Sequence, residues 1–278
     1  MRILKLANRE IKTEKKAFVM GILNVTPDSL WNKSCGGLRT ALKLIEDGAD
    51  ILDIGAESSR PGSKYIDSNV ELKRIIPIIK KIRKYSNIPI SIDTRKSEVL
   101  SACLEEGADI LNDISSLEDD DNLGKLCAKW NIPVILMHKR NIPLHMQKNT
   151  YYEDIFKDVE SYLFERIDYA LKCGISSDKI IIDPGIGFGK DTNGNCVLVK
   201  HCGQLCGGRY PVLMALSRKS FLGSLTNRDV KDRLSSTITA NILSIMNGAS
   251  IIRVHDVKEA VDSLSILNSI EYCLQKEE

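Results

Sequence analysis

The chain has 278 residues, 43% of them hydrophobic, and its 39 basic and 37 acidic residues leave a formal net charge of +2. That hydrophobic content excludes a disordered chain, and the balanced charge argues against a dedicated nucleic-acid binder, which usually carries a basic domain or stripe. No apolar run is long enough to span a membrane, and charges interrupt the start MRILKLANREIK, unlike a secretory signal. We therefore expect a soluble, cytoplasmic protein with no membrane or nucleic-acid partner.

Short β-rich runs recur along the chain, and a stretch with helical patterning follows each of them. The runs are nearly continuously apolar instead of alternating, which is typical of strands that are covered on both faces in a parallel sheet. We expect strands at Phe18–Val25, Ile51–Gly55, Ile90–Thr94, Ile110–Ser115, Val134–His138, Ile180–Asp183, Val212–Ser217 and Ile251–His255.

Mixed polar and apolar stretches between these runs predict helices. They include Val70–Tyr85, Ser97–Gly107, Tyr152–Cys173 and Asp229–Asn247. A glycine ends several such stretches, as expected of a helix C-cap before the next strand. These glycines are Gly48, Gly107 and Gly248.

The number of strand–helix units indicates the fold. Eight units in about 260 residues match a (β/α)8 barrel in count and size. We therefore expect an α/β fold, a single TIM-barrel domain over residues 1–278, with a short N-terminal hairpin or extension before Phe18 that covers the barrel bottom. A doubly wound sheet is the alternative, but its nucleotide fingerprint is missing, because residues 185–190 read GIGFGK and not G-x-G-x-x-G.

Each expected strand is apolar until its last residues and then turns polar or charged. A buried carboxylate costs several kcal/mol unless it is paired, so chance is a poor explanation for so many polar residues. Because the C-terminal strand ends of a barrel converge on one mouth, these residues predict an active site there. They are Asn24, Asp53, the loop 57–62, Asp93, Thr94, Asn112, Asp113, His138, Asp183, residues 217–220, Arg253, His255 and Asp256.

Two kinds of chemistry occur in this set. A carboxylate accepts two parallel hydrogen bonds from the amidine-like edge of a flat heterocycle, which suits Asp93, Asn112 and Asp183. An anion, most simply a phosphate or pyrophosphate, suits the cationic or basic side chains of Arg60, Lys219, Arg253 and His255. The turn 217–220 is expected to open the seventh helix and to add backbone N–H groups for the anion. Because no covalent nucleophile stands out, the set suggests a group transfer driven by leaving-group stabilisation.

The eight cysteines include no CxxC pair, so we expect free thiols. Cys196, His201, Cys202 and Cys206 have the residue types of a metal site, but their spacing matches no common zinc signature. We therefore expect them to share a helix and its loop by chance.

At this point a family resemblance is clear. The chain resembles the dihydropteroate synthases, the folate-pathway family of pterin-binding TIM barrels, over nearly its whole length. NVTPDS and DPGIGFGK are highly specific, and all matching stretches occur in the family's order. The stretches are MGILNVTPDS (20–29), GADILDIGAESSRPGS (48–63), ISIDTRKSEV (90–99), GADILNDISSL (107–117), PVILMHKRNIPLHMQ (133–147), IIIDPGIGFGK (180–190), SRKSFLG (217–223) and GASIIRVHDVKE (248–259).

The resemblance implies a Mg²⁺-dependent transferase that joins 4-aminobenzoate to 6-hydroxymethyl-7,8-dihydropterin pyrophosphate and releases pyrophosphate. By this resemblance, the pterin would be bound by Asp93, Asn112, Asp183 and Lys219, with apolar walls from Ile114, Met137 and Phe188. The pyrophosphate would contact Asn24, Arg253 and His255, and Asn24 would also bind Mg²⁺. The aminobenzoate would lie near Ser59, Arg60, Pro61, Lys219 and Ser220.

The mechanism that the resemblance implies is dissociative. The C–O bond to pyrophosphate breaks first, and the dihydropterin delocalises the positive charge on its exocyclic carbon before the aromatic amine attacks. The catalytic residues would be Asp93, Lys219 and Arg253. The resemblance further implies a homodimer through the seventh and eighth helices, and competition of sulfonamides with aminobenzoate.

The sequence departs from the family pattern at several positions. Residues 24–37 read NVTPDSLWNKSCGG, a longer first loop in which Trp31 is expected to take an aromatic role. Ala215 replaces a usual glycine, and its methyl group would crowd the pterin ring, whereas Lys139 adds a charge near the mouth. Two alternatives stay open: a pterin-binding paralogue without synthase activity, and a pterin-dependent methyltransferase, for which no corrinoid module is evident.

Overall fold

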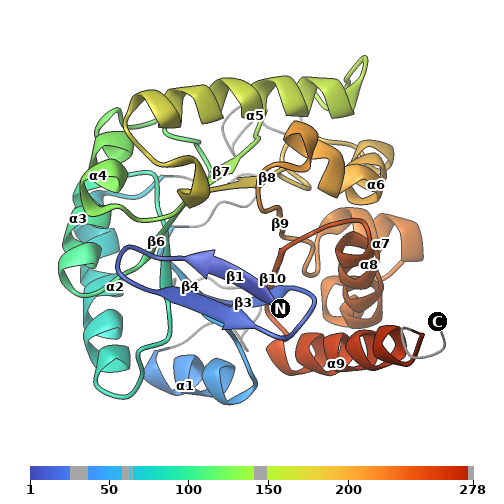
Figure 1. Ribbon diagram of the computed structural model, residues 1–278, viewed down its shortest axis with the longest axis horizontal. Coiled ribbons are helices and arrows are strands. Elements are labelled where there is room, and N and C mark those ends of the chain that lie inside the picture. The colour runs from blue at the N-terminus through green and yellow to red at the C-terminus, as the bar shows by residue number, and fades with distance from the viewer. Residues whose placement is uncertain (26–36, 58–62, 64, 141–148, 275–278) are drawn as a thin grey trace.

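The computed structural model describes residues 1–25, 37–57, 63, 65–140 and 149–274, with the backbone alone for 271–274. Its main sheet has eight parallel strands in the order β8-β7-β6-β5-β4-β3-β10-β9, and helices surround it (Figure 1). A parallel bridge between Ile182 and Val212 joins β8 to the segment before β9 and closes the ring. The predicted (β/α)8 barrel is therefore confirmed, and the doubly wound sheet is excluded.

The barrel strands are β3 (Phe18–Asn24), β4 (Ile51–Gly55), β5 (Ile90–Asp93), β6 (Ile110–Asp113), β7 (Val134–Met137), β8 (Ile180–Asp183), β9 (Leu213–Met214) and β10 (Ile251–Val254). The helices are α1 (Leu38–Glu46), α2 (Ser68–Arg83), α3 (Ser97–Glu105), α4 (Asn122–Trp130), α5 (Ile155–Lys172), α6 (Thr192–His201), α7 (Ser220–Thr226), α8 (Leu234–Met246) and α9 (Val257–Leu274). Short 3-10 helices lie at η1 (Ser177–Lys179), η2 (Cys202–Gly208) and η3 (Val230–Asp232). Among the described residues, no helix is both long and apolar enough to cross a membrane.

Most expected elements are confirmed to within a few residues, and the main difference is at β9. The strand expected over Val212–Ser217 has only Leu213–Met214 as regular strand. The chain leaves the sheet because it turns at Arg218, whose φ is +57°, and because Ser217 binds His255 on the next loop. The expected glycine caps are confirmed, since the glycines after α1, α3 and α8 all have positive φ.

Two apolar layers explain why the strands are nearly continuously apolar. The larger layer lies between the outer face of the strands and the helices, and it includes Val19, Leu52 and Leu136. The smaller one fills the inside of the barrel, and it includes Met20, Ile51, Ile110, Ile135, Ile181 and Ile251. Because strand side chains alternate in direction, both layers need apolar residues from every strand.

The predicted N-terminal hairpin is also present and closes the barrel bottom. It consists of β1 (Arg2–Lys5) and β2 (Glu10–Thr13), which pair antiparallel. Figure 1 shows this hairpin, in blue, lying across one end of the barrel. Leu4 and Leu6 pack into the inner layer, and buried Lys179 donates to the carbonyls of Lys5 and Leu6. The bottom is therefore sealed by apolar contacts, and the polar strand ends lie at the opposite mouth.

Candidate active site

The inward face of the strands changes from apolar to polar toward the mouth. Since strand side chains alternate, the residue two positions after an inner-layer residue also faces the barrel interior. Ile51 is followed in this way by Asp53, and Ile251 by Arg253. In the same way, Asn112 follows Ile110 on β6 and Asp183 follows Ile181 on β8, so both face the interior. The pairing of β5 with β6 places Asp93 beside Asn112.

Arg253 lies between two carboxylates at this level. Its Nε donates to Asp53 Oδ2 at 2.6 Å, and its Nη2 donates to Asp93 Oδ2 at 2.9 Å. Asn112 Nδ2 also donates to Asp53 Oδ2, at 3.1 Å. A Cβ on Gly55 would lie 3.2 Å from Asp93 Cβ, so this glycine makes room for the carboxylate. Side chains from β4, β5, β6 and β10 thus form one network. At its centre is Asp53, which was predicted at the mouth but without a specific ligand.

Burial and ion pairing set the charges of these groups. Burial raises the pKa of Asp93 to about 7, and the attraction of Arg253 opposes this rise while the like charge of Asp53 adds to it. Burial also raises the pKa of Asp183, against the attraction of Lys219. For Arg253, burial lowers the pKa, but the attraction of Asp53 and Asp93 prevails and the net shift is upward. Asp93 therefore exchanges a proton near neutral pH, whereas Arg253 stays cationic.

A second cluster forms where β8 meets the loop after it. Asp183 Oδ1 accepts a hydrogen bond of 2.6 Å from Gly185 N–H. Lys219 Nζ donates to the carbonyl of Ile186 and lies 4.8 Å from the centroid of the Phe188 ring. Burial lowers the pKa of Lys219 to about 8, and Asp183 opposes this shift. The guanidinium of Arg253 on β10 also acts electrostatically on Asp183 and Lys219. The two clusters therefore form one site.

The buried Lys190 is part of this region, although sequence reasoning did not single it out. Its Nζ lies 2.8 Å from His138 Nδ1. It also donates to the carbonyls of Gly185 (2.9 Å), Phe188 (3.1 Å) and His138 (3.3 Å). Burial lowers the pKa of His138 to about 2, so its ring is neutral and Nδ1 is an acceptor. Lys190 therefore ties the end of β7 to the loop after β8.

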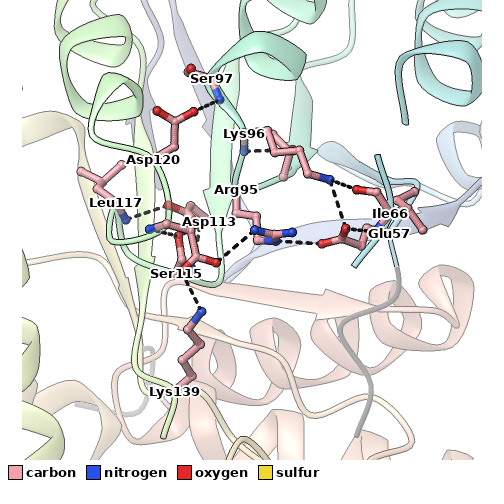
Figure 2. A network of polar contacts seen from close by, with 12 residues as sticks. Glu57, Ile66, Arg95, Lys96, Ser97, Asp113, Ser115, Leu117, Asp120 and Lys139 are labelled. Carbon is pink, nitrogen blue, oxygen red and sulfur yellow. Dashed lines mark hydrogen bonds and ion pairs between the residues drawn. The ribbon is translucent and has the colours of Figure 1, made fainter. Parts of the chain in front are cut away.

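Other polar strand ends stabilise the mouth instead of facing a substrate. Asp113 accepts from Ser115 N–H and Leu117 N–H, both at 2.7 Å, and so shapes the turn after β6 (Figure 2). Arg218 makes two hydrogen bonds to Asp256, at 2.8 and 3.0 Å, and both side chains are only 4% exposed. These residues hold the loops after β6, β9 and β10 in place.

An ion-pair network ties together the loops after β4, β5, β6 and β7, and Figure 2 shows it from close by. Glu57 accepts from Arg95 Nε at 3.0 Å and from Lys96 Nζ at 3.1 Å. Arg95 continues to Asp119 at 3.3 Å, and Lys139 Nζ lies 3.7 Å from the same carboxylate. Lys139 does add a charge near the mouth, as predicted, but that charge is paired and its side chain is 8% exposed.

Two predicted anion-binding residues, Asn24 and His255, lie at the ends of the neighbouring strands β3 and β10. His255 donates its N–H to Ser217 Oγ at 3.2 Å, and its Nδ1 lies 2.9 Å from the same oxygen. Asn24 ends β3, half-buried, and in register it lies beside Gly55, the neighbour of Asp93. Exposed Ser220 begins α7, as predicted for the turn 217–220.

Of the remaining predicted residues, the structure describes Ile114, Met137, Phe188 and Ala215. Ile114 and Met137 are buried, and Phe188 is half-buried. Ala215 packs in the inner apolar layer. Ser59, Arg60, Pro61 and the first-loop residues 30–35, with Trp31, lie outside the described residues.

Among the described residues, no cysteine takes part in the polar networks outlined above for the mouth. Cys202 Sγ donates to the carbonyl of Ser244 at 3.3 Å, and Cys196 is exposed. In the described part of the chain, no three His, Cys, Asp or Glu side chains form a group able to hold a metal ion. Free thiols are confirmed for Cys103, Cys127, Cys173, Cys196, Cys202 and Cys206.

Comparison with known proteins gives a consistent result. The family model for pterin binding enzymes matches residues 20–255. The dihydropteroate synthase of Clostridium beijerinckii is 37% identical over 262 residues, which are 92% of this chain and 95% of that protein. That of Escherichia coli K12 is 39% identical over 256 residues, 90% of each chain.

Solved structures agree in fold over almost the whole chain. The Yersinia pestis dihydropteroate synthase in complex with a sulfonamide drug has a TM-score of 0.91 at 34% identity, covering 98% of this chain and 100% of that one. The Xanthomonas albilineans dihydropteroate synthase with 4-aminobenzoic acid has a TM-score of 0.88 at 37% identity, covering 97% and 98%.

Proposed function

Since the chain belongs to the dihydropteroate synthase family, transferases of folate biosynthesis, we propose that it joins 4-aminobenzoate to 6-hydroxymethyl-7,8-dihydropterin pyrophosphate and releases pyrophosphate. The observation that carries the proposal is the gathering of Asp93, Asp183, Lys219 and Arg253 at one barrel mouth. A hydrogen-bonding surface for a ring and a cation for its diphosphate are thus adjacent, as the reaction requires.

The pterin ring would bind on the β8 side of the mouth. Gly185 N–H holds one oxygen of Asp183, so the carboxyl group is oriented before the ligand arrives. Its other oxygen would accept from the amino-pyrimidine edge of the ring, and Asn112 would bind the opposite polar edge. Lys219, close to Asp183 and to the Phe188 ring, would donate to a ring acceptor. Met137 would pack against the ring face.

The pyrophosphate would bind on the β10 side, near Arg253, His255 and Asn24. The structure's donor set fits Mg²⁺ bound mainly by substrate: this ion usually takes one or two protein oxygens, phosphate oxygens and water. Asn24 offers one amide oxygen at the end of β3, and in the described part of the chain there is no acidic or histidine cluster to form an all-protein cage. Bound there, Mg²⁺ would supply charge neutralisation for the leaving group.

Arg253 connects the two halves of the reaction. Its guanidinium is bonded to Asp93 in the structure, and the incoming pyrophosphate would compete for it. When Arg253 turns to the diphosphate, Asp93 loses its nearest positive partner and can instead stabilise the cation that develops on the pterin. Pyrophosphate leaves with both electrons of the C–O bond, the amine nitrogen of aminobenzoate attacks the exocyclic carbon of the resulting cation, and the new secondary amine releases one proton. Removing one such charged contact costs on the order of 10²–10³ in rate.

The test is product formation by the purified chain. Dihydropteroate and pyrophosphate should form from the two substrates with Mg²⁺, and Lys219→Ala and Asp183→Ala should remove this activity while thermal unfolding stays cooperative. A folded wild-type chain without turnover would reject the proposal. Calorimetry with each substrate separates the paralogue alternative, which predicts pterin binding without pyrophosphate-dependent binding of aminobenzoate.

We also propose that the chain forms a homodimer through its last helices. Figure 1 shows α7, α8 and α9 side by side on one flank of the barrel. Large apolar side chains are exposed there: Leu243 (49%) and Met246 (66%) on α8, and Ile266 (62%) and Ile270 (57%) on α9. Their spacing of three and four residues puts each pair on one helix face. Exposed apolar side chains on two helices in contact suit a second copy of the chain.

A further inference from the structure

The loop between β8 and α6, residues 184–190, supports several of the groups assigned to the pterin, and we call it the β8–α6 loop. Its Gly185 N–H orients the Asp183 carboxyl group. Its Ile186 carbonyl accepts from Lys219 Nζ, and its Phe188 ring lies against the same ammonium group. The position of the loop backbone therefore decides where these groups lie relative to a bound ring.

Two buried side chains fix this backbone through hydrogen bonds. Lys190, 4% exposed, binds the carbonyls of Gly185 and Phe188 and anchors both to His138 at the end of β7. Every hydrogen-bond acceptor around its Nζ is neutral, and burial lowers the pKa of Lys190 well below its usual value, against the attraction of Asp183. The lysine therefore serves backbone geometry and is not one half of an ion pair.

Asn195 on α6 is the second support. It is 1% exposed, and its Oδ1 accepts from Gly187 N–H at 2.8 Å. Its Nδ2 donates to the carbonyl of Asp191 at 2.7 Å, which fixes the amide orientation. Gly187 also borders the lysine of the site, since a Cβ there would lie 3.4 Å from Lys219 Cδ. Lys190 thus holds Gly185 and Phe188, and Asn195 of α6 holds Gly187 between them.

We propose that Lys190 and Asn195 are positioning residues for the pterin: they hold the β8–α6 loop so that Asp183, Lys219 and Phe188 converge on the ring. The inference rests on the proposed function and deepens it, because it assigns ring affinity to side chains that touch no substrate. Losing one well-aligned hydrogen bond to a charged group costs roughly 10–100-fold in affinity. We therefore expect Lys190→Met to weaken pterin binding by roughly 10–100-fold.

The chain offers a matched control in Lys179. It too is a buried lysine, 6% exposed, whose ammonium binds backbone carbonyls, those of Lys5 and Leu6, but at the barrel bottom. Lys179→Met removes the same kind of contact far from the mouth. It should lower the unfolding temperature comparably and leave pterin affinity at the wild-type value.

The experiment measures 6-hydroxymethylpterin affinity by calorimetry, and thermal unfolding, for wild type, Lys190→Met, Asn195→Ala and Lys179→Met. We expect selective loss of affinity in the first two variants. In turnover, KM for the pterin substrate should rise while kcat changes by less than about threefold, because the leaving-group contacts come from β10. If Lys190→Met fails to fold, Asn195→Ala carries the test.

The outcomes separate the two claims. A wild-type chain that binds no pterin rejects the proposed function, and this inference with it. A wild-type chain that binds pterin, with folded Lys190→Met or Asn195→Ala binding it equally well, rejects only the positioning role. Equal loss of affinity in Lys179→Met would also reject it, since the effect would then follow general stability.

Discussion

Gly185→Ala is the substitution for which the structure predicts the largest local effect. Gly185 has φ +67°, and a Cβ built on it would lie 1.8 Å from the carbonyl oxygen of His138. Real Cβ atoms stay at least about 3.0 Å from such an oxygen, so the loop or the end of β7 must move by more than 1 Å. That movement breaks the bonds from Gly185 to Asp183 (2.6 Å) and to Lys190 (2.9 Å).

The expected loss of stability can be worked from these contacts. An L-residue in the left-handed region costs about 1–2 kcal/mol, and the hydrogen bond to the Asp183 carboxyl group contributes about 1.5–3 kcal/mol. The bond from Lys190, whose pKa burial lowers well below its usual value, contributes about 0.5–1.5 kcal/mol. Together the loss is about 3–6.5 kcal/mol, a large part of the roughly 5–15 kcal/mol by which a domain is stable. The chain then either unfolds near room temperature or folds with a displaced β8–α6 loop and poor pterin affinity.

Gly174→Ala is the control for backbone strain alone. Gly174 has φ +94°, but a Cβ there would meet only Ala128 Cβ, at an ordinary 3.5 Å. It should therefore cost about 1–2 kcal/mol and leave pterin binding unchanged. Urea unfolding and calorimetry with 6-hydroxymethylpterin measure both effects. If Gly185→Ala matched Gly174→Ala in stability and wild type in affinity, the reasoning about this loop would be refuted.

Three further predictions concern charge and assembly. Arg218→Met leaves the buried Asp256 unpaired and should cost about 3–5 kcal/mol in urea unfolding; a loss below about 1 kcal/mol would contradict a buried ion pair. The pKa of Asp93 rises from 3.8 to about 7 on folding, so the fold loses stability as pH rises from about 4 to about 7 and no more above it. Asp93→Asn should therefore be more stable than wild type at pH 8, by up to about 4 kcal/mol, and calorimetric scans should show this advantage vanishing toward pH 4. Met246→Glu, paired with Ile266→Glu, should convert the proposed dimer to monomer in analytical ultracentrifugation without changing helical content, and an unchanged sedimentation coefficient would contradict the proposed interface.

The sequence predicts the barrel and its mouth well because both follow from local patterns. Continuous apolar runs arise since each strand serves two apolar layers, and polar strand ends arise since the mouth is the one place where inward residues meet no core. The alternation of side chains along each strand, which can also be read from the sequence, separates residues that face the barrel interior from residues that stabilise loops. Counted from the inner-layer residues, Asn112 and Arg253 face inward, whereas Asp113 and Asp256 fall on the outward positions and stabilise loops.

What the sequence could not predict depends on which side chains meet across the barrel. The pairing of Arg253 with Asp53 joins residues 200 positions apart, and no local pattern encodes it. Lys190 and His138 meet because β7 and β8 are neighbours and their loops touch. A lysine after a glycine-rich stretch looks like a substrate ligand in sequence, and only the three-dimensional arrangement shows that it binds backbone carbonyls.

The order of strands around the barrel has a consequence for synthesis in the cell. β10 lies between β3 and β9, with Ile251 opposite Phe18, so the first barrel strand receives its second neighbour only when residues 251–254 have left the ribosome. Throughout most of translation β3 therefore presents an unsatisfied apolar edge, the feature that favours aggregation of nascent chains. A chain truncated before residue 251 would keep that edge permanently and should depend on chaperones to stay in solution.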